Sequence, residues 1–239
     1  NTAADLRALE PADARFGALG EQLEALEMIR KAVGQDTPII WTVFSPLMVL
    51  PFLLAGGRAQ AVALMRAEPT AVEQALDAMA VTLEAYARAA VESGADGLFY
   101  ATNMATRELS TAAECRRFQR PYDLRILRQV ESAPFNLLHV CGAGILFDEF
   151  TDYPATAFSW ATVPGNPSLA EVHRRTGRAA IGGLPAKPEI ASMPPAEVET
   201  RGRRAVAEMG GRFLVLGPDC SINPDTPDAV MDAATAATR

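Results

Sequence analysis

Two side chains that bind soft metals, His139 and Cys141, lie at the end of an apolar segment, 135–141. Residues i and i+2 of a β-strand point to the same side, so the imidazole and the thiol can face one site. A third candidate ligand, Cys220, follows a second apolar segment, 212–217. One histidine and two cysteines, with a fourth position open, form a known catalytic zinc set. The pattern therefore predicts a zinc site made by His139, Cys141 and Cys220.

The His-x-Cys pair alone is equally typical of a packed histidine and a buried thiol in a core strand. Cys220 favours the metal site, because all three residues follow apolar strands at the edge where parallel α/β proteins build their sites. Zinc binds thiolates strongly and does no redox chemistry. A thiol that enters the open position loses its proton at neutral pH and can then attack an electrophile such as a methyl group. The sequence contains no competing Ser-His-Asp arrangement, phosphate loop or isolated carboxylate pair.

The 239 residues carry 22 basic and 29 acidic side chains, a net charge of −7. No cluster of Lys and Arg with interleaved aromatic residues is present, which argues against a nucleic-acid partner. The longest apolar stretch, 38–54, is interrupted by Pro46 and Pro51, so no membrane helix of roughly 18 to 20 residues is expected. Three widely spaced cysteines argue against a disulfide framework and favour a reducing compartment. We therefore expect a cytoplasmic protein.

Helical patterns recur along the whole chain. Apolar residues at spacings of three to four predict amphipathic helices over 11–33, 70–93 and 111–131. Thr70, with Glu73 three places on, is expected to cap the second of these, and Pro121 to break the third. Further helices are predicted over 145–153, after Ser168, over 195–209 and from Pro227.

Six strand patterns alternate with these helices, at 38–44, 97–102, 135–141, 157–160, 179–184 and 212–217. Repeated strand–helix units without a composition break predict parallel βαβ units in a single α/β domain over 1–239. No Gly-x-Gly-x-x-Gly follows the first strand, and polar groups end several strands. Both features favour a (β/α)8 TIM-type barrel over an open doubly wound sheet. Such a barrel needs eight strands, so either two carry too weak a pattern to be recognised or the first two lie outside this sequence.

Several further side chains stand at or just past strand ends, where they could line a substrate pocket. The aromatic ones among them are more typical of packing at a barrel rim. Asp219, next to Cys220, is the candidate catalytic residue, expected to orient a ligand or protonate a leaving group, or else to cap the following turn. Cys115 and His173 are expected to have no role in the site. The candidate substrate-binding residues are Phe44, Ser45, Tyr100, Asn103 and Trp160.

Four segments match the motifs of one known family. They are the strand from Pro38 with its Ser45-Pro46 turn, the helix-to-strand join 92–97, His139-Val140-Cys141-Gly142, and 216–220 leading to 224–227. On these motifs the chain over 38–235 resembles the uroporphyrinogen decarboxylase superfamily. Within it, the resemblance is to the branch of zinc-dependent corrinoid and thiol methyltransferases, the methylcobalamin:coenzyme M methyltransferase-like proteins.

The resemblance implies a (β/α)8 barrel that holds zinc on His139, Cys141 and Cys220. It also implies a small thiol acceptor that takes a methyl group from a corrinoid, either methylcobalamin or one carried by a separate corrinoid protein. The fourth zinc position is left open among water, substrate and a residue such as Asp148 or Glu149. The sequence names neither the thiol nor the methyl donor, and a homodimer is compatible with it.

Two other functions stay open as alternatives. True decarboxylases lack these zinc ligands, and their arginine-rich first-strand motif and catalytic aspartate have no counterpart in this sequence. Decarboxylation of a tetrapyrrole is therefore disfavoured, but a uroporphyrinogen decarboxylase-like activity is the first alternative. A non-catalytic corrinoid-binding role is the second.

Overall fold

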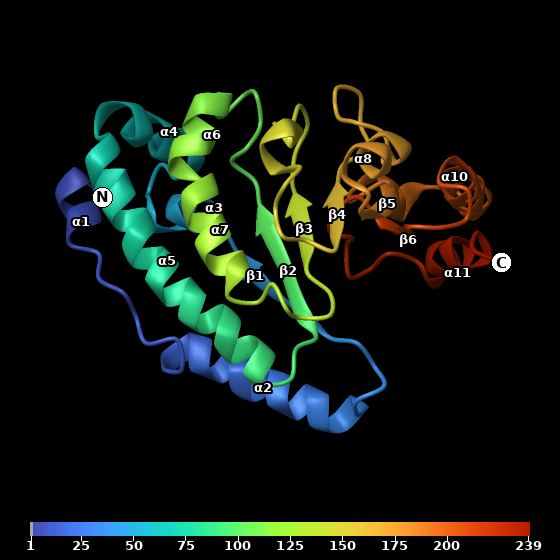
Figure 1. Ribbon diagram of the computed structural model, residues 1–239. Coiled ribbons are helices and arrows are strands. Elements are labelled where there is room, and N and C mark those ends of the chain that lie inside the picture. Colours follow the sequence, from blue (N-terminus) through green and yellow to red (C-terminus); the bar gives the residue numbers. More distant parts are fainter. Residues whose placement is uncertain (1) are drawn as a thin grey trace.

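Six parallel strands form a single sheet in the computed structural model, which describes residues 2–239 (Figure 1). Each strand pairs with its neighbours in the sequence, so the spatial order is β1-β2-β3-β4-β5-β6. This order, with helices in the connections, is that of a (β/α)8 barrel wall. The predicted TIM-type fold is confirmed as a partial barrel, whose sheet stays open between its two outer strands. The strands are β1 (Ile40–Phe44), β2 (Gly97–Thr102), β3 (Leu137–Val140), β4 (Ala157–Trp160), β5 (Ala179–Leu184) and β6 (Leu214–Pro218).

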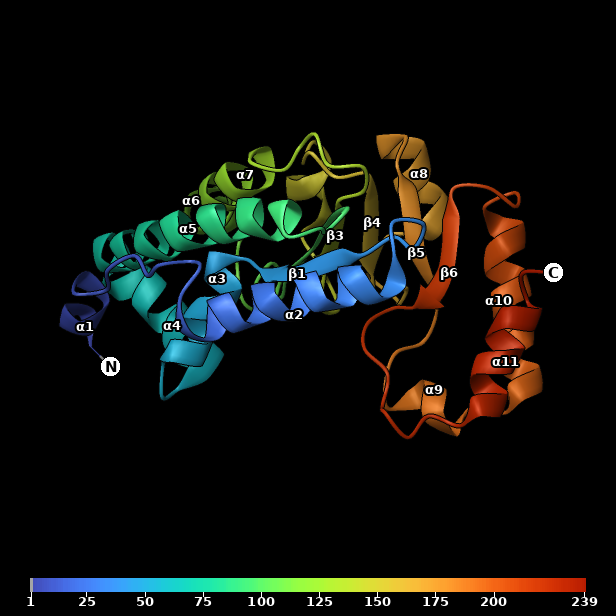
Figure 2. The ribbon, with the colours of Figure 1, turned by 90° about the horizontal axis from the view of Figure 1, so that it is seen from below.

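The helices fill the connections between strands, as the periodicity predicts. The α-helices are α1 (Ala3–Arg7), α2 (Gly17–Val33), α3 (Pro46–Val49), α4 (Gly57–Ala67), α5 (Pro69–Glu92), α6 (Ala112–Phe118), α7 (Arg120–Arg128), α8 (Leu169–Thr176), α9 (Glu189–Ser192), α10 (Pro195–Glu208) and α11 (Asp228–Ala236). Two 3-10 helices, η1 (Leu50–Leu53) and η2 (Phe147–Phe150), complete the set. Seen from below, α5, α6 and α7 lie together on one side of the strands, and α10 and α11 lie beyond β6 (Figure 2).

The start of α5 corrects one sequence prediction. Glu68 is its N-cap and Pro69 its first residue, so Thr70 lies inside the helix and does not cap it. Proline suits this position because the first N–H groups of a helix have no partner within the helix and the fixed φ of proline is already helical.

The region between β2 and β4 differs from prediction at two places. The break in the helical pattern falls at Gln119, between α6 and α7, and Pro121 lies in the first turn of α7. A proline costs little there, for the same reason as at the start of α5. The helix predicted over 145–153 is reduced to the single turn η2.

One face of the sheet is covered by helices and holds most of the core. The register pairs Tyr100 with Leu138 and Val140 with Trp160, so these four side chains share that face. All four are buried in the largest apolar cluster, which includes residues of α5, α7 and α8. The near-continuous apolar character of these strands follows from this cover.

A buried carboxyl group links this core to α7. Asp123 is 0% exposed and accepts hydrogen bonds from the hydroxyls of Tyr100, at 2.6 Å, and Tyr153, at 3.2 Å. Burial raises the pKa of Asp123 to about 7, and the hydrogen bonds counteract the rise only in part. The folded protein therefore holds this proton more tightly than the unfolded chain does.

Within residues 2–239, no single helix is long and apolar enough to cross a membrane. The bent pair formed by 46–53 and 57–67, at 111° to each other, meets the length and composition requirements together. The cytoplasmic location stays a prediction.

The Asp123→Asn variant tests the buried proton. Because the pKa of Asp123 is higher in the folded than in the unfolded state, its contribution is fully present near pH 4 and is lost as pH rises to about 7. At about 1.4 kcal/mol per pKa unit, the upper limit of this loss is about 4 kcal/mol. Urea unfolding measures the free energy of unfolding of both proteins. We expect wild type to lose stability relative to Asp123→Asn as the pH rises over this range. The exposed Asp36→Asn is the control, and equal pH slopes for wild type and Asp123→Asn would contradict the assignment.

Candidate metal centre

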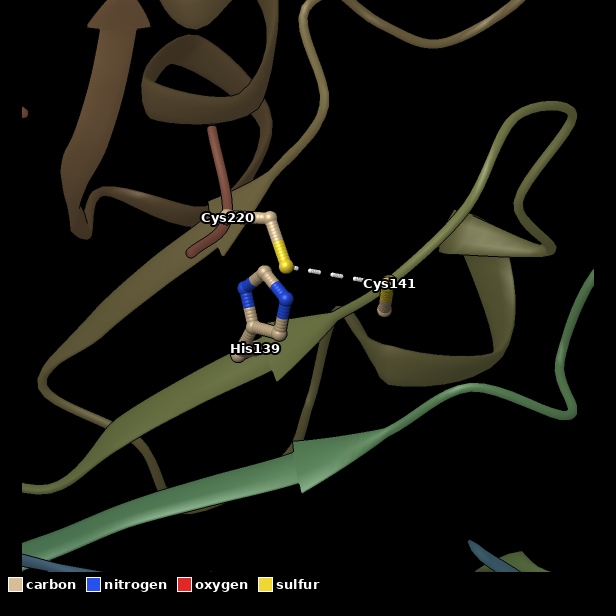
Figure 3. A group of neighbouring side chains, drawn as sticks. All are labelled: His139, Cys141 and Cys220. Carbon is tan, nitrogen blue, oxygen red and sulfur yellow. Dashed lines mark hydrogen bonds between the residues drawn. The ribbon is translucent and has the colours of Figure 1, made fainter. Parts of the chain in front are cut away.

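The structure brings the three predicted ligands together. His139 lies in β3, Cys141 directly follows that strand, and Cys220 lies two residues after β6. Their potential ligand atoms all lie within 4.8 Å of one another. The two sulfurs, 79 residues apart in the sequence, are separated by 3.9 Å. In Figure 3 the ring of His139 points toward the sulfur of Cys220, and Cys141 lies beside them.

Backbone pairing explains how Cys220 reaches the other two ligands. The N–H of Asp219 donates to the carbonyl of Leu184, at 2.7 Å, so the chain leaving β6 stays against the end of β5. The N–H of Lys187 donates to the carbonyl of Ser221, at 3.0 Å, and holds the other side of the cysteine. Cys220 is therefore fixed by backbone hydrogen bonds on both sides, as a metal ligand requires.

Two neighbours fix the ring of His139. Its Nδ1 lies 3.1 Å from Oγ of Ser159, its partner in the register of β4. The ring of Phe99 stacks on it with centroids 5.3 Å apart. In the tautomer with its proton on Nδ1, the ring donates to Ser159 and has its lone pair on Nε2, where it can bind a metal.

The remaining ring nitrogen has no protein partner. Nε2 of His139 is buried and makes no hydrogen bond among the described residues. A buried polar atom without a partner is rare in folded proteins. A nitrogen lone pair beside two half-buried sulfurs is a donor set that suits Zn²⁺, with one position left for another ligand. The residues present thus fit zinc.

The two acidic residues considered for the fourth position do not join the group, which contains no Asp or Glu from the described residues. Asp148 pairs with Arg175. Glu149 pairs with Arg116 at 2.8 Å. Neither residue is therefore placed to fill the open position.

The hydrogen bond between the two cysteines shifts their pKa values in opposite directions. A hydrogen bond from Cys141 lowers the pKa of Cys220, and the neighbouring imidazole of His139 acts in the same direction. The same hydrogen bond, together with burial, raises the pKa of Cys141, while the guanidinium of Arg58 acts in the opposite direction. Cys220 is thus the first thiolate, and metal binding must release the proton of Cys141.

Asp219 is held by several donors. Its carboxylate accepts from the N–H of Thr162 at 2.7 Å, from the hydroxyl of the same residue at 2.8 Å, and from the N–H of Gly183 at 3.3 Å. Burial raises the pKa of Asp219. These contacts join the loop after β4 to β5 and so position the neighbouring Cys220. A direct catalytic role for Asp219 stays a prediction.

Three of the five candidate pocket residues have contacts elsewhere. Tyr100 and Trp160 lie on the helix-covered face, opposite His139. The hydroxyl of Tyr100 donates to Asp123, and the indole N–H of Trp160 donates to the carbonyl of Pro167 at 2.9 Å. Ser45 caps α3, since its Oγ accepts from the N–H of Met48 at 3.1 Å.

The other two candidates lie on the face of His139. Phe44 pairs in register with Ala101, is 38% exposed, and packs against Phe52 with ring centroids 6.2 Å apart. Asn103 follows β2 beside Cys141, and its Oδ1 is buried without a hydrogen-bond partner. Contact of either residue with substrate stays a prediction.

Sequence reasoning missed Ser159 and Phe99, the two residues that hold the imidazole of His139. A serine inside the four-residue apolar strand 157–160 was the available signal. Its meaning depends on the register between β3 and β4, which the sequence does not show.

Comparison with known proteins places the chain in a family. The family model described as uroporphyrinogen decarboxylase (URO-D) matches residues 1–239. The chain belongs to the uroporphyrinogen decarboxylase family. Among curated URO-D relatives, it is 28% identical over 217 residues to the methylcobamide:CoM methyltransferase MtaA of Methanosarcina barkeri, which covers 90% of this chain and 62% of that protein. It is 26% identical over 233 residues to the uroporphyrinogen decarboxylase of Sorangium cellulosum, covering 93% and 63%.

Solved structures show the same fold. A methyltransferase from Methanosarcina mazei superposes with a TM-score of 0.80 at 24% identity, covering 96% of this URO-D chain and 69% of that chain. A B12-independent methionine synthase from Shewanella sp. W3-18-1 superposes with a TM-score of 0.61 at 14% identity, covering 90% and 65%. The chain spans about three fifths of the length of the curated relatives that it matches.

The Ser159→Ala variant tests the support of His139. Without the hydroxyl, the imidazole loses the partner that fixes its tautomer, and zinc affinity is expected to fall by about 10- to 100-fold. Competition with a chromophoric chelator measures the change, and circular dichroism checks the fold. Ser132→Ala, at an exposed serine, is the matched control and should bind zinc as wild type does. Wild-type affinity in Ser159→Ala would show that the hydroxyl does not orient the ring.

Proposed function

We propose that this URO-D family member is a zinc-dependent methyltransferase that moves a methyl group from a corrinoid to a thiol. The observation that carries this function is the convergence of three soft ligand atoms within 4.8 Å, one of them a buried nitrogen without a partner. A relative whose name states transfer from methylcobamide to CoM supports it. Methylcobalamin or a corrinoid protein as donor, and a cytoplasmic location, belong to the same proposal.

His139, Cys141 and Cys220 would hold the ion. When bound, Zn²⁺ supplies Lewis acidity that makes an incoming thiol lose its proton at neutral pH. The thiol proton passes to solvent, and the thiolate sulfur attacks the methyl carbon. A sulfur–carbon bond forms as the cobalt–carbon bond breaks, and its electron pair stays on cobalt.

The residues around the ligands prepare this step. Ser159 would orient the ring of His139 through Nδ1, so that Nε2 faces the two sulfurs. The ring of Phe99 covers one side of the imidazole and limits the access of water to it. Asp219 holds the segment that carries Cys220, so that the two sulfurs stay close together.

Metal analysis and methyl transfer test the function together. Protein purified without chelator is expected to hold about one equivalent of zinc, and Cys220→Ala to lose it, because two ligands bind far more weakly than three. With methylcobalamin and a thiol, the formation of cob(I)alamin is followed by its absorbance. Loss of a residue that only orients a metal ligand lowers activity by about 10- to 100-fold. The rate of methyl transfer should fall by more than this in Cys220→Ala, because a ligand itself is lost. Cys115→Ala, at the buried cysteine outside the group, is the matched control and should keep both zinc and rate.

Three outcomes would replace this proposal. Less than about a tenth of an equivalent of zinc, unchanged in Cys220→Ala, would exclude a metal role for the ligands. Decarboxylation of a porphyrinogen by metal-free protein would support the uroporphyrinogen decarboxylase-like alternative. Binding of cobalamin and zinc without methyl transfer to any thiol would support the non-catalytic one.

A further inference from the structure

Asn103 lies next to the metal ligands although it is not one of them. The register pairs Ala101 with His139, and the N–H of Cys141 donates to the carbonyl of Thr102 at 2.8 Å. The pairing of β2 and β3 therefore continues past both strands and sets Asn103 beside Cys141. By the alternation of side chains along a strand, Asn103 belongs to the same face as Ala101 and His139.

The side chain of Asn103 has an unused hydrogen-bonding group. The residue is 8% exposed, and its Oδ1 is buried without a hydrogen-bond partner among the described residues. Other polar groups near the ligands have partners, since Ser159 bonds His139 and Asp219 accepts from Thr162. A carboxamide oxygen only accepts hydrogen bonds, so this site has an acceptor in need of a donor.

The metal ligands cannot supply that donor. Metal binding removes the protons of Cys141 and Cys220, and Nδ1–H of His139 already faces Ser159. Water and the corrinoid methyl donor also reach this site under the proposed function, but the acceptor thiol is the species whose sulfur takes the position beside the two cysteines. An N–H or O–H group on that molecule is the donor that the carboxamide oxygen lacks.

We propose that Asn103 is a specificity-determining residue whose carboxamide oxygen accepts a hydrogen bond from the acceptor. The preferred acceptor is thus a small thiol that carries an amine or hydroxyl group close to its sulfur. This assignment rests on the methyltransferase function proposed above and adds the class of its thiol. A site built to bond an N–H or O–H group rejects an analogue without one, because the buried oxygen is then left unpaired.

Thiol binding to Co²⁺-loaded protein tests this assignment without methyl transfer. The absorbance of cobalt–thiolate charge transfer gives a Kd for each of four two-carbon thiols. Two, 2-aminoethanethiol and 2-mercaptoethanol, carry a donor. Ethanethiol and 2-mercaptoethanesulfonate carry none. Wild type should bind the donor-bearing pair at least about tenfold more tightly.

Two variants of Asn103 separate its role from that of the metal ligands. Asn103→Leu should bind Co²⁺ normally and lose the preference. Asn103→Asp keeps the size and the acceptor oxygen, so it should keep the preference and favour 2-aminoethanethiol, as an ammonium, over 2-mercaptoethanol. Gln119→Leu is the matched control, because its Oε1 is also buried without a partner but its Nε2 bonds Thr102 on the helix-covered face. This variant should retain the wild-type preference.

The remaining outcomes would each contradict either the role of Asn103 or the proposed function. Equal affinities of wild type for all four thiols, or an unchanged preference in Asn103→Leu, would exclude Asn103 from acceptor recognition. Loss of Co²⁺ from both Asn103 variants would assign the residue to the metal site instead. A clear thiol preference without methyl transfer would overturn the proposed function and leave the role of Asn103 standing. Absence of metal binding in wild type would overturn both.

Discussion

Parallel pairing of the strands in sequence order is the constraint on which the rest of the structure depends. It turns all six carboxyl ends to one edge of the sheet, so ligands from β3 and from the segment after β6 share one site. The same hydrogen-bonded ladder sets Ser159 beside His139 and Asn103 beside Cys141. The backbone thus brings the three candidate ligands together.

Both faces of the sheet hold buried polar groups, and Oε1 of Gln119, on the helix-covered face, has no hydrogen-bond partner among the described residues. On the helix-covered face, Asp123 is satisfied within the protein by two tyrosine hydroxyls. On the opposite face, Nε2 of His139 and Oδ1 of Asn103 have no hydrogen-bond partner within residues 2–239. An unpartnered buried group costs about 1–3 kcal/mol, which binding of a metal and a substrate would offset. The two unpartnered atoms on the face of His139 differ from that of Gln119 in lying beside the candidate metal ligands.

The family includes both methyltransferases and decarboxylases among the relatives of this chain, so the fold does not decide between them. The candidate ligand set distinguishes the two enzyme activities better than the fold does. A group of two cysteines and an oriented imidazole suits a metal ion that activates a thiol. The proposed function therefore depends on three side chains and the residues that hold them in place.

The sequence by itself determined the fold class, six strands to within two residues at each end, and the three candidate ligands, because apolar periodicity and residue chemistry are local properties. Only the tertiary structure decided which strand-end residues face the site. Tyr100 and Trp160 fall on the helix-covered face, while Ser159 and Asn103 fall beside the ligands. A side chain's face depends on the register between strands, and a shift of one residue reverses it. That register is set by long-range backbone hydrogen bonds, which no local pattern in the sequence records.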